Sequence, residues 1–194
     1  SGASTSSILQ ALDTCISREV DILNMSLGSN YPSQVLDNAV DTVVQEGIIA
    51  CVAAGNSGPS SGTINSPSSA RLALSVAATD SNKRVASFSS RGPCKWNAWP
   101  KPDCSGFGVD VLSASHRGGY CVMSGTSMAS PGVAGVLACL LEHEKDNSDG
   151  GMLVDHLVRN GGDSLGQPVE SVGTGFISLE GIENFLSPYG GIQN

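Results

Sequence analysis

A serine with small neighbours stands where an apolar stretch gives way to a helical pattern. The segment reads Ser124-Gly125-Thr126-Ser127-Met128-Ala129-Ser130-Pro131. A hydroxyl in such a strand-to-helix turn lies at the positive end of the helix, where backbone N–H groups can face a developing oxyanion. Ser127 is therefore a candidate nucleophile for attack on a carbonyl carbon. Glycine turns before a capping serine are also common without any chemistry, so this segment alone leaves both interpretations open.

Two further segments follow dense apolar runs and end in turns. Ala53-Ala54-Gly55-Asn56 closes one run, and Met25-Ser26-Leu27-Gly28 closes another. Sheets of parallel strands bind their ligands beyond the carboxyl ends of the strands. The Asn56 amide could there donate a hydrogen bond to an oxyanion, and the backbone after Met25 could pair with an extended peptide. Considered by itself, the Asn56 segment is better explained as an ordinary glycine turn, and the segment after Met25 says little.

The elements that must position these residues are indicated by the pattern of the first 54 residues. A helix is predicted to begin near Ser4, and a second to begin at Ser33 and end at Gly47. The apolar runs at 20–28 and 48–54 are too short for helices and read as strands buried on both faces. Helices that alternate with such strands predict a parallel sheet with helices on both sides.

Beyond residue 55 the pattern indicates a long loop and then further elements. Strands are predicted at 72–78, 85–89, 109–115, 119–124 and 173–179. Helices are predicted at 127–144, at 152–159 and around Glu183. No repeat and no convincing linker interrupts the chain, so we predict a single domain, 1–194, of the α/β class.

Taken together and in this order, the three motifs resemble the subtilisin family of serine proteases. The resemblance covers nearly the whole chain, from the helix near Ser4 to the GTGFISLEG segment, and GTSMASP with AAGN upstream is highly specific. It implies a three-layer subtilisin-like α/β fold with a mostly parallel central sheet. It also implies that this chain is the C-terminal portion of the catalytic domain, and that the N-terminal part is missing from it.

The position of each residue in these motifs implies its role. Ser127 corresponds to the catalytic nucleophile and Asn56 to the donor of the oxyanion hole. Ser26-Leu27-Gly28 corresponds to a strand that binds the substrate, and Ala53-Ala54-Gly55 to a wall of the pocket for the residue before the scissile bond. The implied activity is that of a serine endopeptidase, which hydrolyses peptide bonds in peptides or proteins.

Two members of the family's Asp–His–Ser triad are absent from this sequence. In the family the Asp and the His precede the segment that this chain resembles, and no family role falls on His116, His143 or His156. We therefore expect the N-terminal portion of the same protease, as a separate chain, to supply both, and we expect the 194 residues not to fold stably alone. A recombinant piece, or a protein without any base, would explain the sequence as well.

A protein without a base belongs to a different class, a catalytically dead pseudoprotease acting as a peptide-binding or structural module. The sequence upstream discriminates between the two, because D-[ST]-G and H-G-T-H segments there would favour an active protease. A nucleotide-binding protein is disfavoured because no GxGxxG loop follows the first predicted strand.

Composition disfavours several other classes. The net charge is −8, whereas a nucleic-acid-binding protein needs a basic face. No apolar run reaches the roughly 18 residues of a membrane span. The implied chemistry requires no cofactor and no metal ligand is identified, although the family often binds structural calcium. The resemblance also implies secretion, and a propeptide or an inhibitor as a further partner.

The six cysteines are too sparse for a disulfide-stapled miniprotein. Cys94 and Cys104 bracket a loop rich in tryptophan and proline, where a local disulfide and two free thiols are both reasonable. We predict that these two are bridged. Cys51 and Cys139 lie in apolar patterns and are predicted to be free and buried.

Overall fold

A computed structural model describes residues 3–143 and 160–186 of the chain. Its elements in chain order are α1 (Thr5–Ser17), β1 (Ile22–Met25), α2 (Gln34–Gln45), β2 (Ile49–Ala53), β3 (Leu74–Thr79), β4 (Cys104–Phe107), β5 (Val111–Ala114), β6 (Tyr120–Met123), α3 (Thr126–His143), α5 (Val169–Val172) and α6 (Leu179–Leu186). The helix predicted at 152–159 lies outside the described residues.

The central sheet has four parallel strands in the order β1-β2-β3-β4. Every residue of β2 is buried, as its apolar run predicts, and every residue of β3 is buried as well. Met25, the last residue of β1, pairs with Val52 of β2, so the two strands end at the same edge of the sheet. The turns that follow β1 and β2 are thereby brought side by side.

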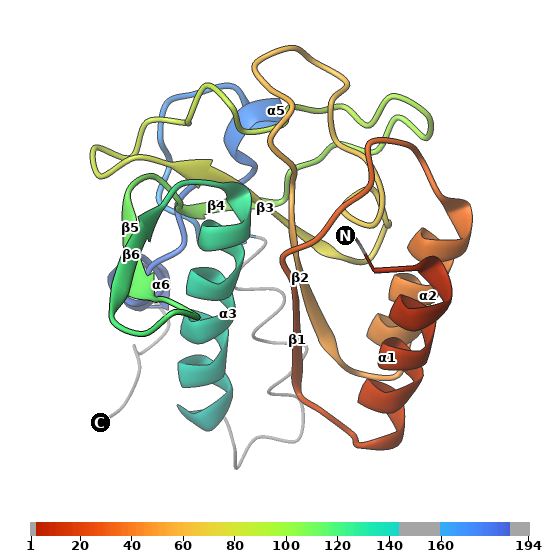
Figure 1. Cartoon of the computed structure of the whole chain (residues 1–194). Coiled ribbons are helices and arrows are strands. Elements are labelled where there is room, and N and C mark those ends of the chain that lie inside the picture. The colour runs from red at the N-terminus through yellow and green to blue at the C-terminus, as the bar shows by residue number, and fades with distance from the viewer. Residues whose placement is uncertain (1–2, 144–159, 187–194) are drawn as a thin grey trace.

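Helices cover both faces of this sheet (Figure 1). Along β2, Ala50 and Val52 belong to the core cluster that contains residues of α1 and α2, whereas Cys51 belongs to the cluster that contains residues of α3. This alternation follows from the two-residue period of a strand. The α3 helix packs against all four strands of the central sheet. The predicted three-layer α/β architecture is confirmed.

The predicted starts of the first two helices are confirmed by their caps. The Ser4 hydroxyl accepts a hydrogen bond from the Ser7 backbone N–H at 3.2 Å, and the Ser33 hydroxyl accepts one from Leu36 N–H at 3.4 Å. Both hydroxyls satisfy donors that have no partner within their helix. Gly47 follows α2 with φ of 91°, the left-handed backbone that glycine tolerates best.

Three predictions about the strands are wrong in whole or in part, and one strand was not predicted. The 20–28 run is not buried on both faces, because β1 lies at the edge of the sheet with Asn24 exposed. The 85–89 segment is not a strand, because Val85 makes a single bridge to Thr79 before the chain turns away. The 173–179 segment makes bridges at Phe176 alone. In contrast, β4 was not predicted, since its sequence, CSGF, lacks β-branched residues.

The predicted disulfide is absent: Cys94 and Cys104 form no disulfide, and both are buried. Cys104 belongs to the core cluster beneath α3, whereas Cys94 packs in a small separate cluster with Ala54 and Ile64. Burial raises the pKa of the Cys94 thiol to about 11, which keeps it protonated and unreactive. Cys51 is buried and forms no disulfide, as predicted, whereas Cys139 forms no disulfide but is exposed.

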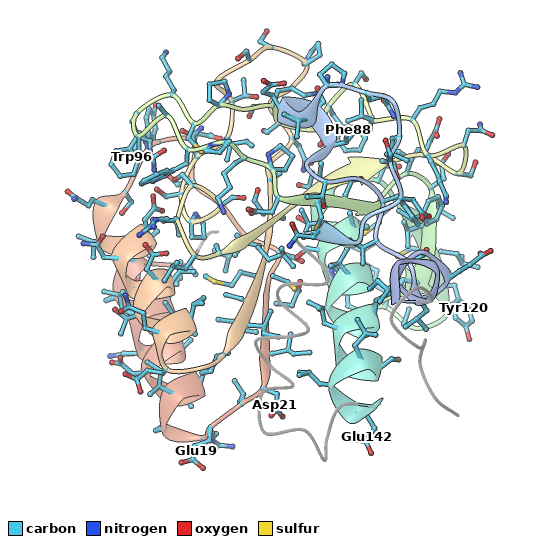
Figure 2. All side chains as sticks on the ribbon, turned by 180° about the vertical axis from the view of Figure 1, so that it is seen from behind. Glu19, Asp21, Phe88, Trp96, Tyr120 and Glu142 are labelled. Carbon is cyan, nitrogen blue, oxygen red and sulfur yellow. The ribbon has the colours of Figure 1, made fainter. Side chains whose placement is uncertain are left out.

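A carboxyl group is buried at the start of α2. Asp37 is only 4% exposed, and its Oδ2 accepts a hydrogen bond from the Ser69 hydroxyl at 2.7 Å. The Trp96 ring, whose Nε1 also donates to that hydroxyl, lies above the start of α2 (Figure 2). Asp37 Oδ1 has no hydrogen-bond partner within the described residues. Burial raises the pKa of the Asp37 carboxyl, and the hydrogen bond from Ser69 offsets this only in part.

We predict that Asp37→Asn stabilises the protein at pH 7, by on the order of 1 kcal/mol. A raised pKa means that the folded state favours the protonated Asp37 carboxyl. The protonated carboxyl therefore contributes its full stability below the unfolded pKa of about 3.9, and this contribution is lost as the pH rises through the folded pKa. The variant should therefore lose its advantage at pH 3.5. Urea unfolding at both pH values tests this, and an equal advantage at both would contradict it.

Candidate active site

Ser127 occupies the first turn of α3, where the predicted strand-to-helix turn is found. The turn is held by the Gly125 N–H, which donates to the Gly108 carbonyl oxygen at 2.8 Å. A β-carbon on Gly108 would lie 2.8 Å from the Gly125 carbonyl oxygen, so this close approach requires a glycine. The start of α3 is thereby fixed against the segment that follows β4.

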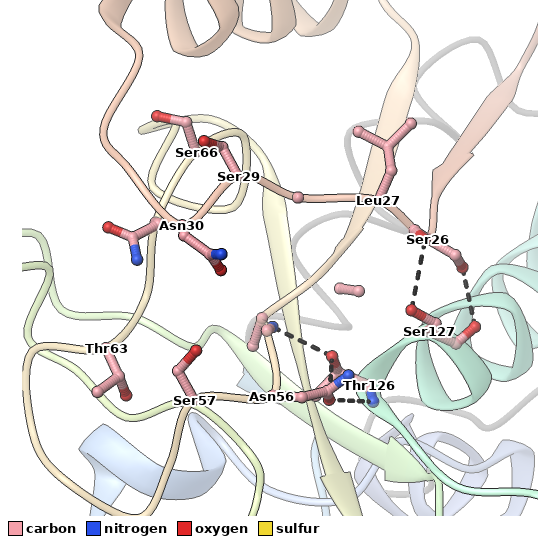
Figure 3. A pocket seen from close by; sticks show the side chains of 15 residues that line it. Ser26, Leu27, Ser29, Asn30, Asn56, Ser57, Thr63, Ser66, Thr126 and Ser127 are labelled. Carbon is pink, nitrogen blue, oxygen red and sulfur yellow. Dashed lines mark hydrogen bonds between the residues drawn. The ribbon is translucent and has the colours of Figure 1, made fainter. Parts of the chain in front are cut away.

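The end of β1 is tied to Ser127 by two reciprocal hydrogen bonds (Figure 3). The Ser26 hydroxyl donates to the Ser127 carbonyl oxygen at 2.8 Å, and the Ser127 hydroxyl donates to the Ser26 carbonyl oxygen at 3.3 Å. The Ser127 carbonyl is available because Pro131, four residues later, has no N–H to donate. The proline in this motif thus creates an acceptor that Ser26 uses.

A second pair of polar side chains supports this contact. The Asn24 amide donates from Nδ2 to the Ser26 hydroxyl at 3.1 Å and accepts at Oδ1 from the Ser130 hydroxyl at 2.8 Å. Ser130 is fully buried and lies one helical turn after Ser127. Sequence analysis missed this role of Asn24 and Ser130. The spacing of these residues could have indicated it. Asn24 lies two residues before Ser26 along a strand, and Ser130 lies three residues after Ser127 on a helix, so the side chains of each pair face the same way.

The Asn56 side chain is oriented by Thr126. Its Oδ1 accepts hydrogen bonds from the Thr126 backbone N–H and from the Thr126 hydroxyl, each at 3.0 Å. A backbone N–H can only donate, so Nδ2 must be the other amide atom. This Nδ2 lies 3.4 Å from the position of a β-carbon on Gly125, and it has no acceptor within the described residues. The amide is thus a fixed donor that remains free to bind a ligand.

The structure brings all the sequence-predicted site residues to one pocket of about 290 Å³. Its lining includes the eight predicted residues: Ser26, Leu27, Gly28, Ala53, Ala54, Gly55, Asn56 and Ser127. Gly55 is required there, because its φ is 106° and a β-carbon would lie 2.8 Å from the Ser90 hydroxyl. Sequence analysis missed the other seven lining residues, which come from the loops after β1 and β2 and from Thr126.

No histidine side chain contacts Ser127 within the described residues. His116 lies in the turn of the β5–β6 hairpin and accepts a hydrogen bond from Arg117. His143 ends α3, which places its backbone about 24 Å along the helix axis from Ser127. His156 is outside the described residues. Among the described residues, no group of three or more His, Cys, Asp or Glu side chains is arranged so that it could hold a metal ion.

The sequence matches the subtilase family, peptidase S8, over residues 1–175. Serine protease AprX of Bacillus subtilis is 37% identical in an alignment 190 residues long, which includes 80% of this chain and 42% of AprX. Subtilisin Savinase of Lederbergia lenta is 35% identical over 177 residues, which cover 91% of this chain and 61% of Savinase. The chain thus spans about two fifths to three fifths of the length of these relatives.

The fold is similar to that of solved proteases. A cold-adapted subtilisin-like serine proteinase superposes with a TM-score of 0.75 at 29% identity, over 91% of this chain and 63% of that protein. A protease described as the S41 psychrophilic protease superposes with a TM-score of 0.72 at 32% identity, over 89% of this chain and 62% of its own. Given the family match over 175 residues and this shared fold, the chain belongs to the subtilase family.

Proposed function

We propose that this chain carries the nucleophile and the oxyanion hole of a serine endopeptidase. The observation that supports this most directly is the free Nδ2 donor of Asn56, fixed by Thr126 at the pocket that Ser127 also lines. The Ser127 backbone N–H is a second donor, because it too lacks an acceptor within the described residues. Two convergent donors beside a hydroxyl suit acyl transfer.

In the proposed reaction, the Ser127 Oγ attacks the carbonyl carbon of the scissile bond. Its proton passes to a histidine, and the carbonyl oxygen becomes an oxyanion that Asn56 Nδ2 and the Ser127 N–H hold. The tetrahedral intermediate collapses when the C–N bond breaks and the histidine protonates the leaving amine. Water then hydrolyses the Ser127 ester by the same steps, which restores the free serine.

The catalytic Asp and His are proposed to come from the N-terminal portion of the same protease, as a separate chain. The outer edge of β1 supports this proposal, because β1 pairs only with β2 in the described sheet and leaves its other edge open to a further strand. The backbone of Ser26, Leu27 and Gly28 is proposed to pair with the extended substrate, or with a propeptide or an inhibitor in its place. Leu27 also lines a second pocket with Ile8 and Leu36, which could hold an apolar substrate residue.

The alternative is a pseudoprotease that binds peptides without cleaving them. It is favoured by one observation, that the Ser127 hydroxyl donates to the Ser26 carbonyl oxygen rather than to a base. Secretion and structural calcium stay predictions from the family resemblance. Within the described residues, no helix is long and apolar enough to cross a membrane.

Asn56→Leu is predicted to lower kcat about 10²–10³-fold with little change in KM, which is the size of effect that one lost oxyanion donor has in subtilisin. Asn56→Asp is the matched variant: it retains an oxygen for the two hydrogen bonds from Thr126 but has no donor, so it should lose at least as much activity. Both variants are measured in the complete protein with a chromogenic peptide. Wild-type kcat in either variant would refute the role of Asn56, and an inactive parent protein would favour the pseudoprotease.

A further inference from the structure

The part of the pocket beyond Ser127 is lined by uncharged polar side chains. They are Ser29, Asn30, Ser57, Thr63, Asn65 and Ser66. In Figure 3, Asn30, Ser57 and Thr63 lie across the pocket from Ser127. No charged side chain from the described residues lines the pocket, and its aliphatic residues are Leu27 and two alanines.

Some of these polar side chains are already occupied by the protein. The Thr63 hydroxyl donates to the Ser60 carbonyl oxygen at 2.9 Å and accepts from the Arg91 N–H at 2.9 Å. The Ser66 hydroxyl accepts from the Ser33 N–H at 2.6 Å and also contacts Ser69. These two hydroxyls hold the loops in place and have little capacity left for a ligand.

Others remain free to bind a ligand. The side chains of Asn30, Ser57 and Asn65 have no hydrogen-bond partner within the described residues. Asn65 is partly buried, and its backbone carbonyl is fixed by the Ser69 N–H at 3.2 Å. The pocket therefore presents two primary amides and one hydroxyl, which together offer both donors and acceptors.

We infer that this pocket selects substrates with an uncharged polar side chain before the scissile bond, and that the primary amides of glutamine and asparagine fit it best. This inference rests on the proposed function, which makes the pocket the site for that residue. An amide side chain can both donate to and accept from Asn30 and Asn65. A lysine or glutamate would lose hydration without gaining an opposite charge, and a leucine would cover the two amides without pairing them.

The test compares four peptide substrates that differ only in the residue before the scissile bond: glutamine, leucine, lysine or glutamate. In the complete protein, kcat/KM for the glutamine peptide should exceed that for each of the other three by about tenfold or more, because an unpaired buried polar group disfavours the mismatched substrate. A leucine or lysine peptide cleaved as fast as the glutamine peptide would overturn the inference.

Variants of the two amides link the selectivity to the pocket. Asn65→Asp should reverse the preference between glutamine and lysine, because the new carboxylate supplies the missing opposite charge. Asn30→Ala, at an exposed position where folding is not at risk, should lower the ratio of glutamine to leucine cleavage. Asn38→Ala, on the exposed face of α2, is the matched control and should leave both ratios unchanged. Unchanged ratios in both pocket variants would also overturn the inference.

A binding measurement separates failure of this inference from failure of the proposed function. The Ser127→Ala form of the complete protein cannot catalyse the reaction, but its pocket is intact. Isothermal titration with the same four peptides should give the tightest binding for glutamine. If the parent protein is inactive while this order of binding holds, the proposed function fails and the selectivity stands. If the protein is active and the order is absent, the selectivity fails alone.

Discussion

Replacement of Ser127 by alanine in the complete protein is expected to abolish labelling by a fluorophosphonate probe and to lower kcat about 10⁶-fold. The probe reacts with a serine hydroxyl only when a base removes its proton and an oxyanion hole receives the phosphoryl oxygen. Loss of the triad serine has an effect of this size in subtilisin. Labelling is followed by mass spectrometry of the peptide that contains residue 127. Ser113→Ala, at an exposed position on β5, is the matched control and should be labelled like the parent protein.

The isolated 194-residue chain gives the complementary result. Its Ser127 hydroxyl donates a hydrogen bond to the Ser26 carbonyl oxygen, and no histidine side chain contacts that hydroxyl within the described residues. We therefore expect this chain to be labelled at least a thousand-fold more slowly than the complete protein, as for a serine without its base. Rapid labelling of the isolated chain at Ser127 would show that the base lies within these 194 residues.

Gly92→Ala is expected to destabilise the protein by about 3 kcal/mol or more, a larger effect than most substitutions produce. A β-carbon at this position would overlap the backbone carbonyl oxygen of Lys101. That oxygen cannot easily move, because the Lys101 side chain is anchored by a 2.7 Å ion pair with Asp103 and a 2.6 Å hydrogen bond to the Ala73 carbonyl oxygen. Gly92 itself is fixed by its N–H, which donates to the Glu170 carbonyl oxygen at 2.8 Å.

The control for this substitution is another glycine-to-alanine change. Gly135 lies inside α3 with nothing within 4 Å of the position of a β-carbon. Gly135→Ala should therefore be stabilising, by about 1 kcal/mol, because alanine is the better helix former. Chemical unfolding of both variants gives the comparison. The structural explanation would be wrong if Gly92→Ala unfolded at the same denaturant concentration as Gly135→Ala.

The fold could be predicted where capping residues and the spacing of apolar residues indicate the same element. Ser4 and Ser33 both precede helical patterns and both cap helices in the structure. The run that forms β2 is apolar on both faces, and β2 lies inside the parallel sheet, between β1 and β3. Because parallel strands end at one edge, the residues that follow β1 and β2 had to lie together. Ser26 and Asn56 accordingly line one pocket in the structure.

The rest depended on tertiary contacts that leave no local signal. β4 forms although CSGF is a poor strand sequence, because Gly106 lets α3 come close: a β-carbon there would lie 2.9 Å from the Val133 side chain. Cys94 and Cys104 are only ten residues apart, yet they pack into different core clusters. The position of Asn65 in the pocket could not be predicted either, because its loop approaches Ser127 only in the folded protein.

The hydrogen bonds between Ser26 and Ser127 join residues that are 101 positions apart, and those between Asn56 and Thr126 span 70. Closing such loops costs chain entropy, and this cost is offset only by the contacts that form when the intervening strands assemble. Contacts between residues so far apart in the sequence are therefore slow to form. We therefore expect Ser127 and Asn56, the proposed nucleophile and oxyanion donor, to come together late in folding. The proposed peptidase activity is therefore expected only once the fold is complete. In a nascent or locally unfolded chain, Ser127 and Asn56 would lie apart, and such a chain would not cleave neighbouring proteins.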